Sequence, residues 1–222
     1  MQINEYFERN RPRVLSEVVG NKGPKRGLQS LIRQGVAPKG TLFHGPAGHG
    51  KTTLARIGAR RIVCTGASPS EPDPCGQCQN CRTGNCKVFE LNAATLTIAH
   101  LKDIQRDSMY VYEEPRVYFV DELHRATDRI QDVLVTMLEE GRANYCFIFC
   151  TLHVERIEEP LLQRLISFKV TPPTTEEMVQ RLKLICVREG WSRPDTMLTE
   201  IAEANHNVPR ACENALFLES LT

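Results

Sequence analysis

A glycine-rich segment at residues 45–53 has the residue types and spacing of a phosphate-binding loop. The pattern G-x-x-x-x-G-K-[ST] lets the backbone fold tightly and point successive N–H groups at phosphate oxygens. We expect Lys51 to reach the β- and γ-phosphates and the Thr52 hydroxyl to hold Mg²⁺. The residues expected around the phosphates are Gly45, Pro46, Ala47, Gly48, His49, Gly50, Lys51, Thr52 and Thr53.

The flanking residues put this loop where it can bind a nucleotide. A strand-like run at 40–44 precedes it, and a helix-like run at 54–60 follows it. The N-terminus of a helix adds partial positive charge, which favours phosphate. A chance glycine-rich turn is the alternative, but it does not require these flanks. The segment therefore predicts nucleotide binding.

Two carboxylates close an apolar run at 116–122. Strands of a parallel sheet covered on both faces are continuously apolar, and ligands bind at their carboxyl ends. We expect Asp121 to hold Mg²⁺, and Glu122 to orient or deprotonate the water that attacks the γ-phosphate. The alternative is that Asp121 only caps the helix that continues toward Leu138.

Five cysteines lie between Cys64 and Cys86. Cys75, Cys78 and Cys81 follow the spacing C-x-x-C-x-x-C, and Cys64 is the expected fourth ligand of a tetrahedral zinc site, with Cys86 in reserve. A ferredoxin-type iron–sulfur run continues with three residues and Cys-Pro, whereas four residues separate Cys81 from Cys86 here. Thiols without metal are the third alternative. Four protein ligands leave no open position, so a zinc ion here would be structural.

The remaining pattern predicts an α/β protein with two units. Strands are expected at 40–44, 88–91, 116–122, 144–150 and 165–170, with a helix at 97–109 between the second and third. Thr151 follows the fourth strand, so its hydroxyl should face the phosphates. After the double proline at 172–173 only helix-length segments remain, at about 175–189, 195–205 and 209–220. We predict a nucleotide domain at 1–170 and a helical lid domain at 171–222.

Composition limits the functional classes. The 222 residues carry a formal net charge of +1, so no global field attracts nucleic acid, although residues 1–40 hold eight Lys/Arg against three acids. That local excess suits a nearby anion or a solvated basic face. No segment is apolar enough to cross a membrane and the N-terminus lacks a secretion signal, which predicts a cytoplasmic protein. Nine cysteines in that compartment indicate metal binding or chemistry rather than disulfides.

These motifs together resemble the gamma/tau-type ATPase subunit of the bacterial DNA polymerase III clamp loader, in the AAA+ class. The phosphate loop, the Asp-Glu-Leu-His segment at 121–124 and the inserted four-cysteine knuckle at about 64–86 match closely, and most AAA+ proteins lack such a knuckle. Arg11-Pro12 with Val18-Val19-Gly20 is similar to the N-terminal box that packs beside the adenine. The resemblance implies a three-layer AAA+ domain and makes Val19 an ATP contact.

The resemblance also assigns roles to three later segments. Thr151 occupies the sensor 1 position, and Arg210 lies at the start of the sensor 2 helix, where the family arginine touches the γ-phosphate. Gln163-Arg164-Leu165 stands where the family has Ser-Arg-Cys, so Arg164 would act in trans at the ATP site of a neighbouring subunit, with altered flanking residues. For Arg164 the alternative is a surface arginine. The implied catalytic residues are Lys51, Glu122 and Arg164.

The implied function is loading of a sliding clamp onto primer–template DNA, driven by ATP with Mg²⁺ and supported by structural Zn²⁺. Partners would be other clamp-loader subunits, the clamp and DNA. Candidate DNA contacts are Thr95, Thr97, Lys102 and Arg106, although an ordinary amphipathic helix is an equal alternative.

Two further functions stay open: a stator that does not hydrolyse ATP, and a nucleotide-switched adaptor or regulator. The family continues into a collar domain beyond the lid, so we expect either a fragment or a shortened relative.

Overall fold

A computed structural model describes residues 3–34, 38–82, 87–107, 116–140 and 145–221. Its centre is a five-stranded sheet with the order β2-β3-β4-β1-β5, in which every neighbouring pair is parallel. The strands are β1 (Gly40–His44), β2 (Val88–Asn92), β3 (Arg116–Asp121), β4 (Tyr145–Thr151) and β5 (Ile166–Lys169). The predicted parallel sheet is confirmed, and the carboxyl ends of all five strands lie along one edge.

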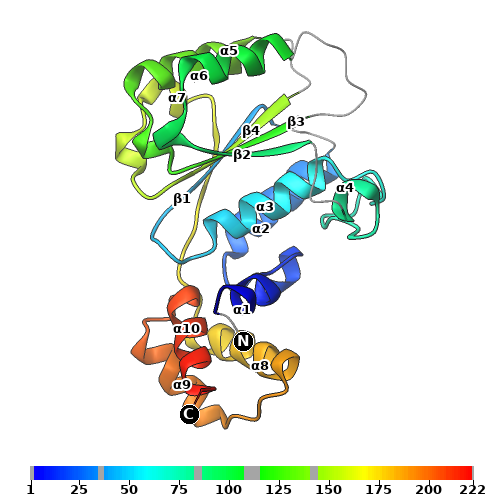
Figure 1. Cartoon of the computed structure of the whole chain (residues 1–222), viewed down its shortest axis with the longest axis vertical. Helices are drawn as coiled ribbons and strands as arrows, with labels where there is room; N and C mark the ends of the chain where they lie inside the picture. The colour runs from blue at the N-terminus through cyan, green and yellow to red at the C-terminus, as the bar shows by residue number, and fades with distance from the viewer. Residues whose placement is uncertain (1–2, 35–37, 83–86, 108–115, 141–144, 222) are drawn as a thin grey trace.

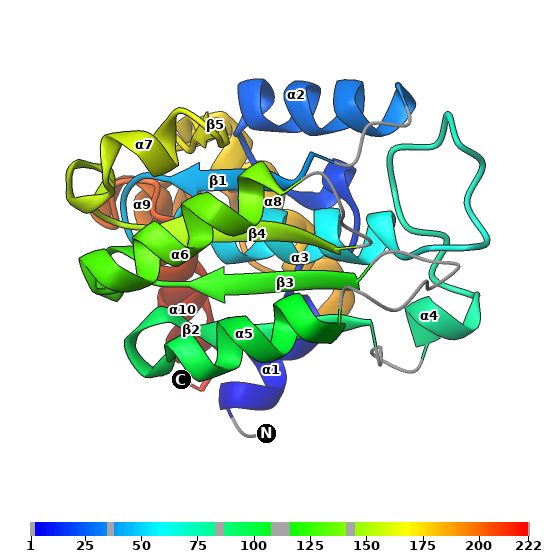
Figure 2. The ribbon, with the colours of Figure 1, turned by 90° about the horizontal axis from the view of Figure 1, so that it is seen from above.

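Helices cover both faces of the sheet, which makes three layers (Figures 1 and 2). One face carries α2 (Lys22–Arg33) and α3 (Lys51–Ile62); the other carries α5 (Ile98–Asp107), α6 (Asp128–Glu139) and α7 (Glu159–Leu162). Successive side chains of β4 alternate between the two layers: Phe147 and Phe149 pack toward α5 and α6, whereas Ile148 and Cys150 pack toward α3. All seven β4 residues are buried, and the six that precede Thr151 are aromatic, aliphatic or cysteine, as in a strand covered on both faces.

The C-terminal helices form a separate cluster at the lower end of Figure 1. They are α8 (Thr175–Glu189), α9 (Asp195–Ala204) and α10 (Pro209–Glu219), each starting at the predicted residue. Thr174 and Glu177 form a capping box that fixes the start of α8, and Gly190 ends the helix in the left-handed conformation.

The first helix, α1 (Ile3–Asn10), packs into this C-terminal cluster rather than onto the sheet. Its Tyr6 ring is fully buried and lies against Trp191 and Phe217, with centroids 5.7 and 4.9 Å away. Residues from the two ends of the chain therefore share one apolar core. Neither α1 nor α2 was predicted from the sequence, and the domain division at residue 170 stays a prediction.

Short elements complete the described chain: α4 (Gln79–Arg82) and the 3-10 turns η1 (Leu15–Glu17), η2 (Ala93–Thr95), η3 (Leu123–Arg125) and η4 (Val154–Arg156). Met109, Asn144 and Cys86, which the sequence analysis placed in a helix, a strand and the cysteine cluster, lie outside the described residues. Within the described ranges, no helix combines the length and the apolar character needed to cross a bilayer.

Candidate nucleotide site and metal centre

The phosphate loop joins β1 to α3 and requires glycine at its turns. Gly45 has a φ of 136°, and a Cβ there would lie 2.8 Å from the Val170 carbonyl oxygen, so no larger residue fits. Gly50 has a φ of 92° and immediately precedes α3, which begins at Lys51. The helix N-terminus therefore faces the loop, as anion binding needs.

Lys51 is 7% exposed and folds over its own loop. Its Nζ donates to the carbonyl oxygens of Gly45 at 2.8 Å and Pro46 at 2.7 Å. Burial lowers the pKa of Lys51, while Asp121 acts in the opposite direction. These two backbone oxygens hold the ammonium group beside the loop, from where it can turn to phosphate oxygens.

The hydroxyl and carboxylate predicted to hold Mg²⁺ are in direct contact. Thr52 Oγ1 donates to Asp121 Oδ2 at 3.2 Å, and Asp121 Oδ1 accepts from the Glu122 backbone N–H at 2.9 Å. A hydroxyl oxygen and a carboxylate oxygen from two different elements are typical protein ligands of a Mg²⁺ ion that also binds substrate phosphates. The residues present therefore fit this ion.

Glu122 follows β3 with a φ of 56°, which is uncommon for a residue with a side chain. Its carboxylate accepts from Arg125 NH1 at 2.9 Å and from Asn92 Nδ2 at 3.4 Å. The hydrogen bond from Arg125 lowers the pKa of Glu122, with a second contribution from Asn92. The carboxylate is thus charged and held by two donors. Asn92 was not predicted from the sequence, although its position at the end of β2 was a usable signal.

Thr151 is buried at the end of β4, beside β3 in the sheet. Its hydroxyl lies 3.2 Å from His124 Nδ1 and donates to the His153 carbonyl oxygen at 3.2 Å. Burial, and then the neighbouring His153, lower the pKa of His124. Thr151 is therefore fixed at the same edge as Asp121 and Glu122.

These groups open into one cleft with a volume of about 670 Å³. That volume is in the range of small-molecule sites. Its lining joins the loop, the carboxyl edge, the N-terminal segment and the C-terminal helices: residues 47–53, Asn92, Asp121, Glu122, Thr151, Arg11, Pro12, Val18, Val19 and Arg210, among others. A Cβ on Gly48 would lie 2.7 Å from Val208 Cγ1, so the segment before α10 touches the loop directly.

Arg164 lies elsewhere. It precedes β5, at the edge of the sheet opposite to the phosphate loop, and the described lining of the cleft does not include it. Its guanidinium pairs with Glu139 and donates to the Pro160 carbonyl oxygen at 2.7 Å. Within one chain, Arg164 and Lys51 are therefore not brought together.

The four candidate DNA contacts are exposed and lie outside the described lining of the cleft: Thr95 is on η2, Thr97 immediately precedes α5, and Lys102 and Arg106 are on α5. Thr95 Oγ1 donates to the Asn92 carbonyl oxygen at 3.2 Å, and Thr97 Oγ1 accepts from the His100 N–H at 3.2 Å. Arg106 pairs with Asp103 at 2.7 Å, and Lys102 is exposed on the same helix. The two threonines thus shape the start of α5.

Asn21 ties three segments together, and no motif pointed to it. It is 4% exposed and has a φ of 51°, just before α2. Its Nδ2 donates to the His49 carbonyl oxygen at 3.0 Å, and its Oδ1 accepts from the Thr171 N–H at 3.0 Å. One side chain therefore connects the phosphate loop with the start of the segment that leads to α8.

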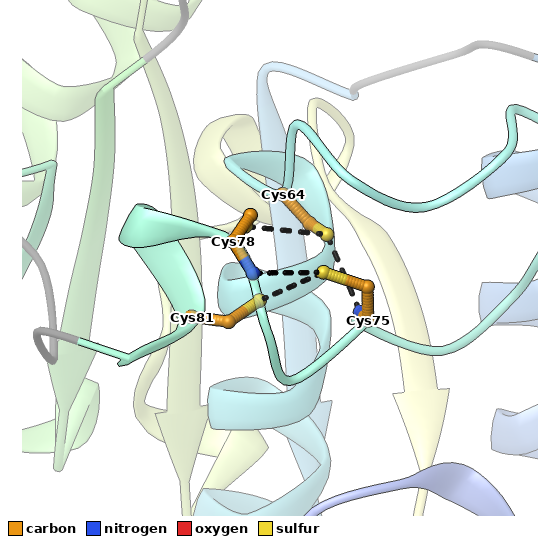
Figure 3. Close-up of side chains that lie close together, drawn as sticks. All are labelled: Cys64, Cys75, Cys78 and Cys81. Carbon is orange, nitrogen blue, oxygen red and sulfur yellow. Dashed lines mark hydrogen bonds between the residues drawn. The ribbon is translucent and has the colours of Figure 1, made fainter.

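The four predicted cysteine ligands converge in a knuckle beyond the end of α3 (Figure 3). The sulfur atoms of Cys64, Cys75, Cys78 and Cys81 all lie within 4.8 Å of one another. Cys64 Sγ is 3.9 Å from Cys78 Sγ, and Cys75 Sγ is 4.0 Å from Cys81 Sγ. Sulfurs held 2.3 Å from a tetrahedral zinc ion are about 3.8 Å apart, so the group fits zinc without rearrangement.

Backbone donors orient the sulfurs of this knuckle. The N–H groups of Gln77 and Cys78 lie 3.4 and 3.3 Å from Cys75 Sγ, and the Cys75 N–H lies 3.3 Å from Cys64 Sγ. A Cβ on Gly66 would be 2.8 Å from Cys75 Sγ, so a bare backbone is needed there. Such donors stabilise thiolates and fix ligand direction.

The three-layer parallel sheet, with its phosphate loop and carboxylate edge, defines this chain as an AAA+ P-loop fold. Among solved structures, the Thermotoga maritima RuvB Holliday junction branch migration motor matches with a TM-score of 0.71 and 20% identity, over 93% of this chain and 64% of that one. At this identity the match supports the fold alone. A family model described as DNA polymerase III, delta subunit, matches residues 20–173, and the chain belongs to this family.

Curated relatives agree with the resemblance to gamma/tau subunits, which is confirmed. The DNA polymerase III subunit gamma/tau of Mycoplasma pneumoniae is 31% identical over 206 residues, covering 89% of this chain and 30% of the relative. The subunit gamma of Buchnera aphidicola subsp. Acyrthosiphon pisum is 29% identical over 214 residues, covering 93% and 58%. The subunit gamma/tau of Mycobacterium tuberculosis H37Rv is 31% identical over 215 residues, covering 92% and 36%. The chain thus spans 30–58% of these relatives' lengths.

Proposed function

We propose that this protein binds ATP with Mg²⁺ in the cleft and hydrolyses it as a subunit of a DNA polymerase clamp loader. The observation that carries the proposal is the meeting of Lys51, Thr52, Asp121 and Glu122 at one edge of the sheet. The relatives named as gamma and gamma/tau subunits support the clamp-loading role. A cytoplasmic location belongs to the same proposal.

The roles follow from the contacts. Lys51 Nζ exchanges the Gly45 and Pro46 carbonyls for phosphate oxygens, which are stronger acceptors because they are charged. Thr52 and Asp121 would hold Mg²⁺, which would neutralise charge on the phosphates. Glu122 orients the attacking water, and its contacts with Asn92 and Arg125 must loosen to free an oxygen.

Arg210 lines the same cleft from the start of α10, where the helix dipole disfavours a cation that lacks an anionic partner. We therefore assign Arg210 to the γ-phosphate, so that the position of the C-terminal lid helices depends on which nucleotide is bound. The four cysteines would hold a structural zinc ion, which would pin the knuckle to the end of α3.

Arg164 completes the site of a neighbouring subunit. Because it lies at the far edge of the sheet from its own phosphate loop, it would act at the site of a neighbour rather than at its own. A guanidinium that meets the charge spread over the γ-phosphoryl oxygens accelerates hydrolysis by several orders of magnitude. The partners are other clamp-loader subunits and the sliding clamp, with the η2–α5 surface (Thr95, Thr97, Lys102 and Arg106) facing primer–template DNA.

A mixing experiment tests this proposal. Arg164→Ala and Glu122→Gln proteins should each bind ATP and hydrolyse it at a small fraction of the wild-type rate. Mixed with primer–template DNA and partner subunits, they should regain activity, because an intact Glu122 can then meet an intact Arg164 of its neighbour. The exposed Arg156→Ala variant is the matched control and should keep the wild-type rate. Full activity of Arg164→Ala alone would contradict the role in trans.

A further inference from the structure

One charged pair in the cleft is not explained by the phosphate-binding motifs. Arg181 of α8 and Glu213 of α10 both line the cleft, together with Phe7 and Val19. Arg181 is only 3% exposed, and its Nε donates to Glu213 Oε1 at 3.0 Å. A buried ion pair is costly to desolvate, so it is weak support for stability by itself. Stability alone therefore does not explain why this pair is buried in the cleft.

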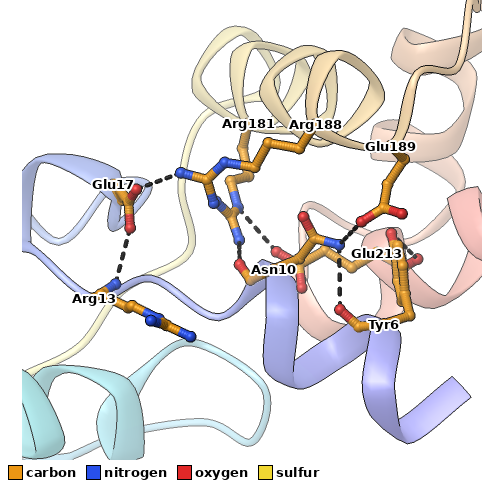
Figure 4. A network of polar contacts seen from close by, with 8 residues as sticks. All are labelled: Tyr6, Asn10, Arg13, Glu17, Arg181, Arg188, Glu189 and Glu213. Atoms are coloured by element: carbon orange, nitrogen blue, oxygen red, sulfur yellow. Dashed lines mark hydrogen bonds and ion pairs between the residues drawn. The ribbon is translucent and has the colours of Figure 1, made fainter. Parts of the chain in front are cut away.

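The hydrogen bonds of Arg181 are incomplete. Its Nε is used by Glu213, and its NH2 donates to the Asn10 carbonyl oxygen at the end of α1 (Figure 4). Its NH1 is buried and has no hydrogen-bond partner among the described residues. A buried donor without an acceptor costs free energy, and native proteins keep few of them. A ligand in the cleft would supply the missing acceptor.

The surrounding network holds this guanidinium in place. Asn10 Nδ2 donates to Glu189 Oε1 at 2.7 Å and to the Tyr6 carbonyl oxygen at 3.1 Å, and the Tyr6 hydroxyl donates to the Glu213 carbonyl oxygen at 3.2 Å (Figure 4). These contacts join α1 to α8 and α10 around the pair. Arg181 is thus preorganised rather than free to search for a partner.

The position of the pair identifies the part of a nucleotide that it meets. Arg210 and Glu213 are three residues apart on α10, so Glu213 lies just under one turn, or about 4.5 Å, further along the helix. A Cβ on Gly48 would be 3.6 Å from Arg210 Cβ, which places the start of α10 at the phosphate loop. Glu213 therefore lies beyond the phosphates, toward the base, where Phe7 and Val19 add apolar surface.

We propose that Arg181 and Glu213 form the base-selecting end of the cleft and favour adenine. Along one edge adenine carries an acceptor, N7, beside an amino donor, whereas guanine carries two acceptors, N7 and O6. The Arg181 NH1 donor and the Glu213 carboxylate acceptor complement the adenine edge. Guanine would bring O6 against the carboxylate, which two acceptors cannot satisfy. The inference rests on the proposed function, because it assumes a nucleoside triphosphate in this cleft.

Calorimetric titration of the full chain with three Mg²⁺-bound nucleotides tests the inference. The nucleotides are ATP, GTP and purine riboside 5′-triphosphate, which lacks the amino group. The variants are Lys183→Met and the Arg181→Met/Glu213→Leu double replacement, which exchanges the charged pair for an apolar pair of similar size. Lys183 lies on α8 like Arg181 and pairs with Asp195 of α9, but it is outside the described lining of the cleft, so it is the matched control.

The wild type and the Lys183→Met control should bind ATP about ten- to a hundredfold more tightly than either other nucleotide, since neither of those can donate the charge-assisted hydrogen bond to Glu213. In the double variant the three affinities should fall within about threefold of one another. Equal affinities in the wild type, or discrimination that survives in the double variant, would overturn the inference while leaving nucleotide binding intact. No binding of any nucleotide by the wild type would overturn the proposed function as well.

Discussion

Replacement of Asn21 should loosen both the phosphate loop and the segment that leads to α8. The Asn21→Gly change removes hydrogen bonds to the His49 carbonyl and the Thr171 N–H, each 3.0 Å long, without backbone strain at a φ of 51°. Each bond contributes about 1 kcal/mol, and a partner left unsatisfied costs about 1–3 kcal/mol. Because Thr171 is exposed and water can replace its lost bond, we expect about 2–4 kcal/mol in total.

The Asn21→Ala variant separates backbone strain from hydrogen bonding. Alanine disfavours the left-handed conformation by about 1–2 kcal/mol, so this variant should be less stable than Asn21→Gly by that amount. Lys22→Ala is the neighbouring control: its pair with Glu177 spans 2.9 Å, but the lysine side chain is 73% exposed. Its loss should cost less than about 1 kcal/mol.

Urea unfolding followed by far-UV circular dichroism measures these differences, and ATP titration of the same proteins measures their effect on the site. We expect Asn21→Gly to weaken ATP binding, because the His49 carbonyl loses its anchor within the phosphate loop. A loss below about 0.5 kcal/mol for both Asn21 variants, in the range of ordinary surface changes, would refute the reasoning.

Three further predictions concern other parts of the molecule. Metal analysis should find about one zinc per chain, and Cys75→Ser or chelation should destabilise the knuckle; iron with visible absorbance would contradict this. Asn92→Ala should raise basal ATP hydrolysis, because Glu122 loses one of its two side-chain donors, and an unchanged rate would show that Asn92 does not restrain it. Lys102→Ala should weaken DNA binding and reduce the salt slope by about 1, which a salt titration of affinity would detect.

The elements that were predicted correctly are those whose positions depend on local pattern. The apolar run that forms β4 indicates a strand covered on both faces without further information, and in the structure all residues of β4 are buried. The phosphate loop and the C-x-x-C-x-x-C run are likewise short-range patterns, in which spacing alone brings the groups together. Their geometry could therefore be anticipated from the chain itself. For the fourth zinc ligand, Cys64 was expected with Cys86 in reserve.

What could not be predicted depends on contacts between distant residues. Asn21 bonds to Thr171 across 150 positions, and Arg181 bonds to Asn10 across 171. The helix α1 was not predicted because it packs on the C-terminal core through Tyr6, and nothing in the sequence of α1 indicates that distant contact. Such placements follow from tertiary packing, which periodicity does not encode.

Equilibrium binding of labelled ATP with Mg²⁺ to the wild type and to Lys51→Ala tests the central claim most directly. The wild type should bind one ATP per chain. Lys51→Ala should bind at least about a hundredfold more weakly, since it loses charge-assisted hydrogen bonds to the phosphates. Equal affinity in the two proteins, or no binding by the wild type, would contradict the assignment of this cleft to a nucleotide.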